Sequence, residues 1–325
     1  MSQLQSFALS GGELHRLEQA RTVAGFQAQR LQPAHKPRVV IVKKANVGFV
    51  RRERRQPNVT WWSHSLSDGT LTVKDAAELV YVGEDPRTGE NIFAAMAHNL
   101  EGPLLAQLEW APSKDGYVLE MTRPEQAAYG LAVSLVRWHA SNRFCANCGT
   151  ATDPTRDVGF SRYCPKCKRQ HFPQLIPAML VTVLDGKGNV ILSQRRKKSK
   201  LLTLLSGFVH HGESAEETVR REVEEETGAK VSEVRYLGSQ PWPYPYMMMM
   251  CYYAVAEASP SLVVEAAELV KVMWVSKQEV RRALEGRHPD IELHGPGTTP
   301  YAMLKPWVDG EVDDHGRRAA PQSKL

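Results

Sequence analysis

Four cysteines place the strongest constraint on how this chain can fold. They form two C-x2-C pairs that are 15 residues apart: Cys145 and Cys148, then Cys164 and Cys167. Each pair can place two thiolates on one turn, and two such turns bring four sulfur ligands around a Zn²⁺ ion. Gly149 follows the first pair and suits the tight backbone turn needed there. The spacing therefore predicts a structural zinc site that is closed by four sulfurs.

Composition favours metal binding over disulfide bonds for these cysteines. The 325 residues are 42% hydrophobic and 24% charged, which is typical of a globular protein of about two domains. No basic segment followed by an apolar one opens the sequence, so we expect no secretory signal and reduced thiols. No uncharged apolar stretch is long enough to span a bilayer. The net charge of +5 is too small for a protein that coats nucleic acid.

The sequence divides into five predicted segments of an α+β fold. In chain order these are a smaller N-terminal α/β domain at 1–123, a linking helix at 124–142, the zinc ribbon at 143–172, a larger domain at 173–311 and a flexible polar tail at 312–325. Apolar runs at 79–82 and 92–95 around a turn-rich stretch predict a β-hairpin. Runs at 176–184 and 190–194 predict two strands. Pro124, followed by apolar residues at helical spacing, predicts the linking helix.

Residues 207–229 contain the most informative pattern. Ser214 and Glu217 form a capping box, so we expect a helix to begin at Ser214 and to end at Gly228. Three carboxylates share one face of this helix: Glu222, Glu225 and Glu226. Apolar residues run beside them, so the carboxylates are expected to lie toward the protein body. Converging oxygen ligands suit Mg²⁺ or Mn²⁺, and the alternative for the charge run alone is a solvated acidic helix.

Eight residues of this segment fill the pattern G-x5-E-x7-R-E-U-x-E-E-x-G, in which U is a bulky aliphatic residue: Gly207, Glu213, Arg221, Glu222, Val223, Glu225, Glu226 and Gly228. The pattern resembles the Nudix box of the Nudix hydrolases, which cleave a nucleoside diphosphate linked to another moiety. The resemblance implies an α/β/α sandwich whose helix binds the catalytic Mg²⁺ or Mn²⁺ through the three glutamates. It also implies structural roles for four residues of the box: Gly207, Glu213, Arg221 and Gly228.

Residues 239–245, SQPWPYP, resemble a motif of the NADH pyrophosphatases. These Nudix hydrolases have a four-cysteine zinc ribbon directly before the Nudix domain, and the resemblance covers about residues 75–310. It implies substrate contacts from three residues of the motif: Gln240, Trp242 and Tyr244. Tyr244 replaces the usual Phe and keeps the ring, whereas Met247 stands where the motif ends in Ser, so a polar contact is lost there.

The resemblance implies metal-assisted hydrolysis of the pyrophosphate in NADH, NAD⁺ and related dinucleotides, which yields nicotinamide mononucleotide and AMP. Glu268 matches a further acidic position and is implied as another metal ligand, with an ordinary surface glutamate as the alternative. Phe208 and Phe172 match aromatic positions that sandwich a base. Such base pockets form across a dimer in these enzymes, so the resemblance also implies a homodimer.

Basic residues suggest a different class of protein. Residues 143–169 contain six Lys or Arg against two Asp, and residues 195–200 form a further basic loop. The alternative is a zinc-ribbon nucleic-acid-binding protein with a non-catalytic Nudix domain, and the intact glutamates argue against it. A combined hypothesis is an enzyme that removes NAD caps from RNA, with the basic residues binding the RNA.

The three residues at the end of the sequence, Ser323, Lys324 and Leu325, match the peroxisomal import signal S-K-L. In a eukaryotic host we therefore expect recognition by the peroxisomal import receptor and a peroxisomal location. The cytoplasm is the alternative location, and no membrane partner is expected.

Overall fold

The computed structural model describes residues 12–43, 46–50, 63–112, 121–195, 197, 199–244, 246–256 and 262–318. The chain divides into two compact units. The N-terminal unit comprises Leu9–Leu175 with Trp242–Tyr246, and most of the C-terminal unit lies in Ile176–Pro241 and Met247–Leu325. The zinc ribbon therefore belongs to the same compact unit as the N-terminal domain.

The N-terminal unit is built on a mixed sheet with the strand order β5-β6-β1-β2-β8, and β3 pairs with β1 beside this path. β1 and β6 are parallel, whereas β5 and β6 form the antiparallel hairpin that the sequence predicts. The strands of this sheet are β1 Pro37–Lys43, β2 Asn46–Val50, β3 His64–Ser65, β5 Val80–Glu84, β6 Asn91–Met96 and β8 Leu108–Pro112. Shorter elements are α1 Glu18–Arg21, α2 Phe26–Arg30, η2 Pro33–His35, η3 Ala76–Glu78, η4 Ala97–Asn99, η5 Pro103–Gln107 and the pair β4 Thr72–Val73 with β7 Leu100–Glu101.

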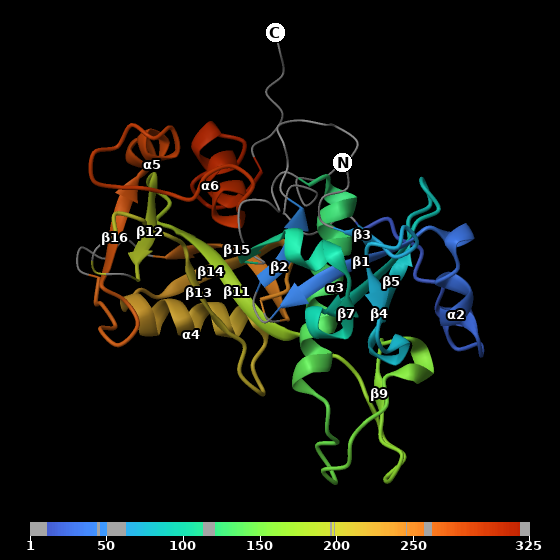
Figure 1. Ribbon diagram of the computed structural model, residues 1–325. Coiled ribbons are helices and arrows are strands. Elements are labelled where there is room, and N and C mark those ends of the chain that lie inside the picture. Colours follow the sequence, from blue (N-terminus) through green and yellow to red (C-terminus); the bar gives the residue numbers. More distant parts are fainter. Residues whose placement is uncertain are drawn as a thin grey trace. The chain divides into compact units, whose positions relative to one another are not determined.

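Helix α3, Arg123–Ser141, packs against β1, β5 and β6 of this sheet (Figure 1). Thr122 and Glu125 form a capping box, so the helix begins within one residue of its predicted start. Tyr129 and Val133 on this helix are fully buried. Of the four apolar residues at the predicted spacing, Leu131 is half-buried, and the other three are buried in the core: Ala128, Leu135 and Trp138.

The zinc ribbon consists of two cysteine turns and a small antiparallel sheet of β9, Arg162–Tyr163, and β10, Gln170–His171. Gly149 has a φ of 70°, which is the left-handed backbone expected at the first turn. At the matching place in the second turn, Lys168 has a φ of 59°. A non-glycine residue thus adopts the same unusual conformation. The ribbon also contains the 3-10 helix η7, Thr155–Asp157.

The C-terminal unit is an α/β/α sandwich, as the resemblance implies. Its sheet has the order β14-β15-β11-β12-β16, with β13 paired to β11. Figure 1 shows α4 on one side of this sheet and α5 and α6 on the other. Val219 and Val223 of α4 pack with Met179 of β11 on one face, whereas Trp307 of α6 packs with Leu180 of β11 on the other. The elements are β11 Ile176–Leu184, β12 Asn189–Gln194, β13 Leu205–Phe208, α4 Ala215–Thr227, β14 Val231–Trp242, β15 Met247–Ala256, β16 Lys271–Ser276, α5 Lys277–Leu284 and α6 Thr299–Asp309.

The predicted flexible tail is wrong for residues 312–318. Val312 is buried, and Oδ1 of Asp314 accepts a hydrogen bond from Nε1 of Trp307 at 2.8 Å. The same oxygen forms an ion pair with Nζ of Lys277 at 2.5 Å. These partners exist only in the folded unit, so the polar sequence gives no sign of the packing. Residues 319–325, which include the S-K-L tripeptide, lie outside the described residues.

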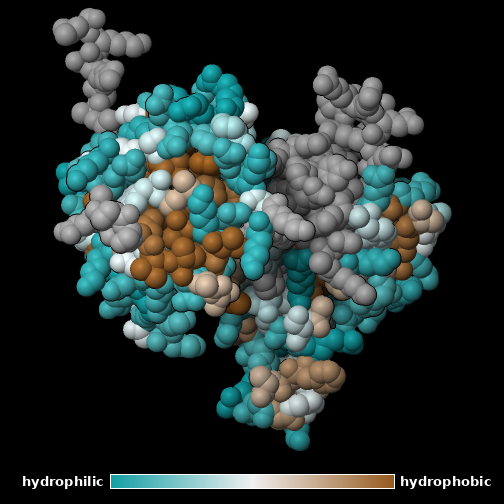
Figure 2. All heavy atoms as spheres, turned by 90° about the vertical axis from the view of Figure 1, so that its left-hand side faces the viewer, coloured by the Kyte–Doolittle hydropathy of each residue, from teal (hydrophilic) through white to brown (hydrophobic). Residues whose placement is uncertain are grey.

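Within the part of the chain that the structure describes, no helix has the length and apolar character needed to cross a membrane. Figure 2 shows one face of the molecule, on which hydrophilic residues surround a smaller apolar area. Cys251 is fully buried in β15, as expected for a strand thiol.

Candidate active site

Helix α4 positions the acidic residues, and its ends follow the predicted signals. The Ser214 side chain accepts a hydrogen bond from the backbone N–H of Glu217, and the Glu217 carboxylate bonds back to Ser214. Gly228 ends the helix in the left-handed conformation, with a φ of 69°, and its N–H donates to the carbonyl of Glu224 at 2.8 Å. Both termini satisfy backbone groups that would otherwise be unpaired. The helix therefore begins and ends where the sequence predicts.

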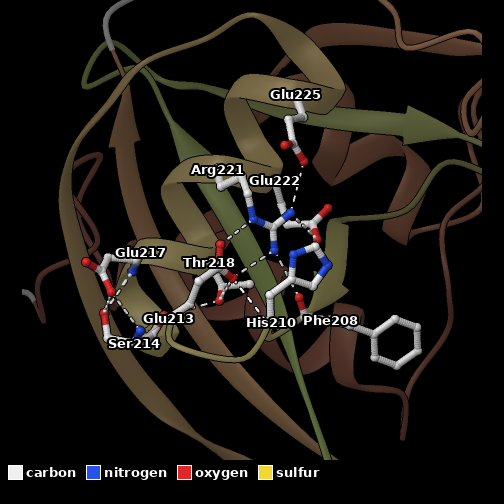
Figure 3. Close-up of polar contacts among 9 residues, drawn as sticks. All are labelled: Phe208, His210, Glu213, Ser214, Glu217, Thr218, Arg221, Glu222 and Glu225. Carbon is white, nitrogen blue, oxygen red and sulfur yellow. Dashed lines mark hydrogen bonds and ion pairs between the residues drawn. The ribbon is translucent and has the colours of Figure 1, made fainter.

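The guanidinium of Arg221 connects helix α4 to the loop at 209–214 that precedes it, which we call the box loop (Figure 3). It donates to Glu213 at 2.6 and 3.0 Å, and to the backbone carbonyl of Phe208 at 3.0 Å. It also donates to one oxygen each of Glu222 and Glu225, both at 2.9 Å. One cation thus contacts three carboxylates. Hydrogen bonding to Arg221 lowers the pKa of Glu213 to about 2, so this carboxylate stays charged while it holds the loop.

Glu213 has further contacts that fix the loop. Its Oε2 accepts hydrogen bonds from the backbone N–H of His210 at 3.1 Å and from the Thr218 hydroxyl at 2.9 Å. Both oxygens of the Glu213 carboxylate therefore accept hydrogen bonds from protein donors. This geometry is what a bracing residue requires, in keeping with the structural role that the resemblance implies for it.

Gly207 lies where β13 passes the helix. A Cβ atom added to Gly207 would lie 1.9 Å from Cδ of Glu222, which is far inside van der Waals contact. The bare backbone of Gly207 therefore lets the Glu222 carboxylate lie directly against β13. A side chain at this position would displace that carboxylate.

Glu226 is the most deeply buried carboxylate of the face, with its side chain 2% exposed. Its Oε1 accepts a hydrogen bond from Arg195 at 3.2 Å, whereas its Oε2 has no hydrogen-bond partner among the described residues. Burial raises the pKa of Glu226 to about 7. The positive charge of Arg195 lowers this pKa, whereas the nearby negative charges raise it further: Glu222, Glu268 and Glu225. A buried, partly unpaired carboxylate in a negative surrounding is a good ligand for a cation.

The four predicted acidic ligands differ in exposure. Glu222 and Glu226 are buried, Glu225 is exposed, and Glu268 is exposed in the turn before β16. Among the described residues, the four cysteines are the only group of three or more potential metal ligands whose ligand atoms lie together, so the glutamates do not form a closed cage. Hard carboxylate oxygens with one buried atom unpaired nevertheless fit Mg²⁺ or Mn²⁺, which bind few protein ligands and keep several waters.

The four cysteines of the ribbon form a much tighter cluster. Their Sγ atoms all lie within 4.8 Å of one another, and the sulfurs of the pairs Cys145–Cys167 and Cys148–Cys164 are each 3.5 Å apart. A tetrahedral ion with Zn–S bonds of about 2.3 Å needs sulfurs separated by roughly 3.8 Å. The cluster therefore fits a structural zinc ion. Nε2 of His171 lies 3.2 Å from Sγ of Cys145.

Two of the predicted base-binding residues are exposed aromatic rings. Phe208 is 52% exposed and Phe172 is 59% exposed. In Figure 3 the Phe208 ring points away from the Arg221 network, although its backbone carbonyl takes part in that network. Neither ring packs in a core, so both are free of the structural role that usually explains a phenylalanine. Their contact with a base stays a prediction.

The three predicted substrate contacts of the proline-rich motif have partners within the protein. Gln240 is buried in the C-terminal unit and accepts a hydrogen bond from the Thr299 hydroxyl. Trp242 and Tyr244 belong to the N-terminal unit, where their rings pack edge to face with centroids 5.1 Å apart. Burial raises the pKa of Tyr244. These contacts hold the loop, and its substrate contacts stay predictions.

Arg195 is a site residue that the sequence analysis missed. The sequence places it in the basic loop, yet its guanidinium reaches Glu226 at 3.2 Å and the carbonyl of Ser206 in β13 at 3.1 Å. The ribbon also uses its basic residues internally. Arg162 is buried, and Arg156 lies 3.4 Å from the centre of the Tyr163 ring. Fewer basic side chains are therefore free for nucleic acid than the sequence suggests.

Two family models match the chain. Residues 140–172 match the NADH pyrophosphatase zinc ribbon domain, and residues 174–293 match the NUDIX domain. Both matches coincide with the two sites described above.

Curated relatives cover part of the chain. An NAD-capped RNA hydrolase, NudC, of Mycobacterium bovis (strain BCG / Pasteur 1173P2) is 38% identical over 154 residues, which are 47% of this chain and 49% of that protein. The NudC of Enterobacter sp. (strain 638) is 34% identical over 55% of this chain and 65% of its own. A mitochondrial NAD(P)H pyrophosphatase of Homo sapiens, NUDT13, is 30% identical over 60% of this chain and 58% of its own. The chain thus spans about half to two thirds of the length of these relatives.

Among solved structures, a NUDIX hydrolase from Nitrosomonas europaea matches 47% of this chain and 97% of its own, with 23% identity and a TM-score of 0.36.

Proposed function

We propose that this chain, which carries a Nudix domain behind a zinc ribbon of the NADH pyrophosphatases, hydrolyses the pyrophosphate bond of NADH, NAD⁺ and related dinucleotides. The products are nicotinamide mononucleotide and AMP. The observation that carries the proposal is the buried carboxylate of Glu226, with one oxygen unpaired, on a helix that also presents Glu222 and Glu225. An acidic site of this kind repels phosphate and therefore needs divalent cations to accept it.

Three glutamates of α4, with Glu268 beside them, would hold the catalytic Mg²⁺ or Mn²⁺: Glu222, Glu225 and Glu226. When bound, such a cation polarises phosphoryl oxygens and activates a water molecule. Arg221 keeps the box loop and the ligand carboxylates in fixed positions through its five hydrogen bonds. Gly207 leaves the space that the Glu222 carboxylate occupies.

The exposed rings of Phe208 and Phe172 are proposed to stack on the bases of the substrate. A base that covers an exposed phenylalanine removes apolar surface from water, so stacking there is favourable and does not disturb a protein core. Stacking tolerates both adenine and nicotinamide, because each has a flat π face. This accounts for a substrate range that includes several dinucleotides.

The direct test is AMP release from NADH by the full, zinc-loaded chain. We expect release with Mg²⁺ and with Mn²⁺, and none after chelation of both. A panel of NADH, NAD⁺ and diadenosine polyphosphates then ranks the substrates. Absence of AMP release from every dinucleotide with either cation would overturn the proposal.

NAD-capped RNA is a second candidate substrate, because two of the relatives carry that activity in their names. In the basic loop, Lys197 is exposed, whereas Lys200 donates to the carbonyl of Pro289 at 2.7 Å. We therefore expect Lys197→Gln to raise the KM for capped RNA and to leave the KM for NADH unchanged. RNA binding without hydrolysis of either substrate would instead support the nucleic-acid-binding alternative.

We further propose that the enzyme is a homodimer, as the resemblance implies. Light scattering after size-exclusion chromatography should then give twice the chain mass of 36.4 kDa. A monomer at that mass, with full activity, would contradict the proposal.

The S-K-L tripeptide at 323–325 is proposed to direct the protein to peroxisomes in a eukaryotic host. An N-terminal fluorescent fusion that leaves Leu325 at the end should enter peroxisomes. The same fusion extended by a few residues beyond Leu325 should stay in the cytoplasm, because the import receptor reads the free tripeptide. Cytoplasmic fluorescence from both fusions would contradict the proposal.

A further inference from the structure

The N-terminal unit contains a cavity of about 720 Å³ between its first two helices and the segment after η7. α2, which marks one wall, is labelled in Figure 1. The volume falls within the range of small-molecule sites and is far larger than a bare phosphate or carboxylate needs. Apolar and cationic side chains line it together: Val23, Phe26, Leu31, Val158, Arg21 and Arg156.

Arg21 is the unusual member of this lining. It is 8% exposed, and its guanidinium carbon lies 3.6 Å from the centre of the Phe160 ring. Its Nε and Nη1 have no hydrogen-bond partner among the described residues, and both atoms are closed off from solvent. Its Nη2 lies 3.9 Å from Oε1 of Glu18, which is too long for a hydrogen bond. A buried guanidinium with donors left unpaired is unfavourable unless an acceptor binds beside it.

The only ion pair of Arg21 among the described residues is the long one to Glu18, whose side chain is exposed. Glu18 and Asp157 raise the pKa of Arg21 against the lowering effect of burial. Asp157, however, uses its Oδ1 to accept from the backbone N–H of Ser161 at 2.9 Å. Arg156 adds a second cation to the lining, where it stacks on Tyr163, and no acidic residue that the structure describes forms an ion pair with it. Among the described residues that line it, the cavity therefore has two guanidinium groups and no carboxylate.

We propose that this cavity binds a small organic oxyanion, either a phosphate monoester or a carboxylate, whose apolar body fills the remaining space. The oxyanion accepts hydrogen bonds from the guanidinium of Arg156 and from Nη2 of Arg21, the guanidinium nitrogen of Arg21 that is not closed off from solvent. The body packs against Phe26, Leu31 and Val158. The site lies wholly within the N-terminal unit and does not depend on the proposed hydrolysis.

The test uses the full, zinc-loaded chain without Mg²⁺ and three probes: phenyl phosphate, benzoate and inorganic phosphate. Titration calorimetry or ligand-observed NMR measures the Kd of each probe for the wild type. We expect one of the two organic probes to bind, which identifies the anionic group. Inorganic phosphate should bind at least about tenfold more weakly than phenyl phosphate if the apolar body contributes.

Two substitutions and a control decide the assignment. Arg21→Met should raise the Kd of the bound probe at least about tenfold, because charge-assisted hydrogen bonds are lost. Arg156→Gln should raise the same Kd by a smaller factor. Arg87→Gln removes an exposed arginine that pairs with Asp85 outside the cavity, and it should leave the Kd unchanged.

Melting temperatures of the variants show whether a loss of probe binding results from unfolding of the protein. Arg21→Met fills a similar volume without unpaired donors, so it should melt no lower than the wild type in the absence of probe. If Arg21→Met fails to fold, Arg156→Gln and Arg21→Lys carry the binding test instead. Failure of every probe to bind, or equal binding by the cavity variants and the wild type, would overturn the proposal.

Discussion

The zinc ribbon and the carboxylate face of α4 are both candidate metal sites, but they differ in how completely their polar groups are paired within the protein. In the ribbon, the four thiols lie together within 4.8 Å, and the neighbouring polar groups are paired. Arg162 is buried beside them and donates to Thr152 at 2.6 and 2.7 Å and to His139 at 2.9 Å. The ribbon is thus complete once a single ion closes it.

On α4 the carboxylates that we propose as metal ligands are bridged by arginines and do not form a closed cluster. Arg221 lies between Glu222 and Glu225, and Arg195 bonds to one oxygen of Glu226, while the other oxygen has no partner among the described residues. Carboxylates repel one another at short range, whereas neutral thiols do not. The four thiols of the ribbon can therefore be brought together by packing alone, whereas the carboxylates of α4 keep a buried oxygen that is free to bind a cation.

Removal of zinc should produce the largest effect, because the ribbon is small and has little core besides its metal. Cys164→Ser should lose the bound zinc and unfold residues 143–172, since structural zinc contributes on the order of 10 kcal/mol to such modules. Metal analysis should find zinc absent. In the wild type, the backbone N–H of residue 164 donates to the carbonyl of Arg169 at 2.8 Å. Hydrogen exchange of the variant should show that this N–H has lost its protection.

The matched control for this prediction is Cys251→Ala. Cys251 is buried in β15 of the other unit, so its variant should retain one zinc per chain and a protected ribbon. A Cys164→Ser protein that keeps both zinc and amide protection would show that the cluster is not the zinc site.

Loss of one carboxylate on α4 should leave the fold intact and remove catalysis. Glu225→Gln and Glu226→Gln should each lower kcat on the order of 10²-fold or more, because a ligand charge is lost without opening a cavity. Glu226→Gln also removes a buried charge, so its melting temperature should not fall. Glu224→Gln, an exposed neighbour on the same helix, should keep wild-type turnover. Near-normal kcat for either ligand variant at limiting Mg²⁺ would place the site elsewhere.

Sequence reasoning reached the parts of both sites that depend on local spacing. The cysteine turns, the capping box of Ser214 and the end of α4 at Gly228 are set by residues a few positions apart, and all appear where predicted. Arg195 was missed because its contact with Glu226, 31 residues later, depends on how β12 and β13 lie beside α4. Asp314 was missed for the same reason, since its partners come together only when α5 and α6 pack.

Each of the two regions also has an exposed phenylalanine, and we expect that removal of the one beside α4 has an intermediate effect on substrate binding. Phe208→Ala should raise the KM for NADH roughly tenfold to a hundredfold, because base stacking contributes ~1–3 kcal/mol. The melting temperature should change little, since Phe208 is 52% exposed. Phe144→Ala, a ribbon phenylalanine that is 67% exposed, should leave the KM unchanged. An unchanged KM for Phe208→Ala, or a large drop in its melting temperature, would mean that the base is bound elsewhere.

The smallest expected effect concerns His139, and it tests whether the polar groups next to the ribbon are all hydrogen-bonded. Its Nε2 lies 2.7 Å from the carbonyl of Gly159, and its Nδ1 lies 2.9 Å from Nη1 of Arg162. A neutral ring with its proton on Nε2 satisfies both contacts, whereas a charged ring would oppose Arg162. Burial lowers the pKa of His139 to about 4, with the Arg162 charge acting in the same direction.

Because an unfolded histidine titrates near 6.5, the unfolded chain binds a proton at this residue between about pH 6.5 and pH 4, and the folded chain does not. The contribution of His139 to stability is therefore complete above pH 6.5 and is lost as the pH falls toward 4. Between pH 7 and pH 5 the loss is about 2 kcal/mol, or roughly 4–8 °C in Tm. The glutamine of His139→Gln cannot titrate. Between pH 7 and pH 5 the Tm of this variant should therefore fall less than the wild-type Tm, by roughly 4–8 °C. Protonation of the cysteines affects both proteins equally. Parallel pH profiles for the two proteins would show that His139 takes up a proton as readily in the folded chain as in the unfolded chain, and that its contacts do not favour the neutral ring.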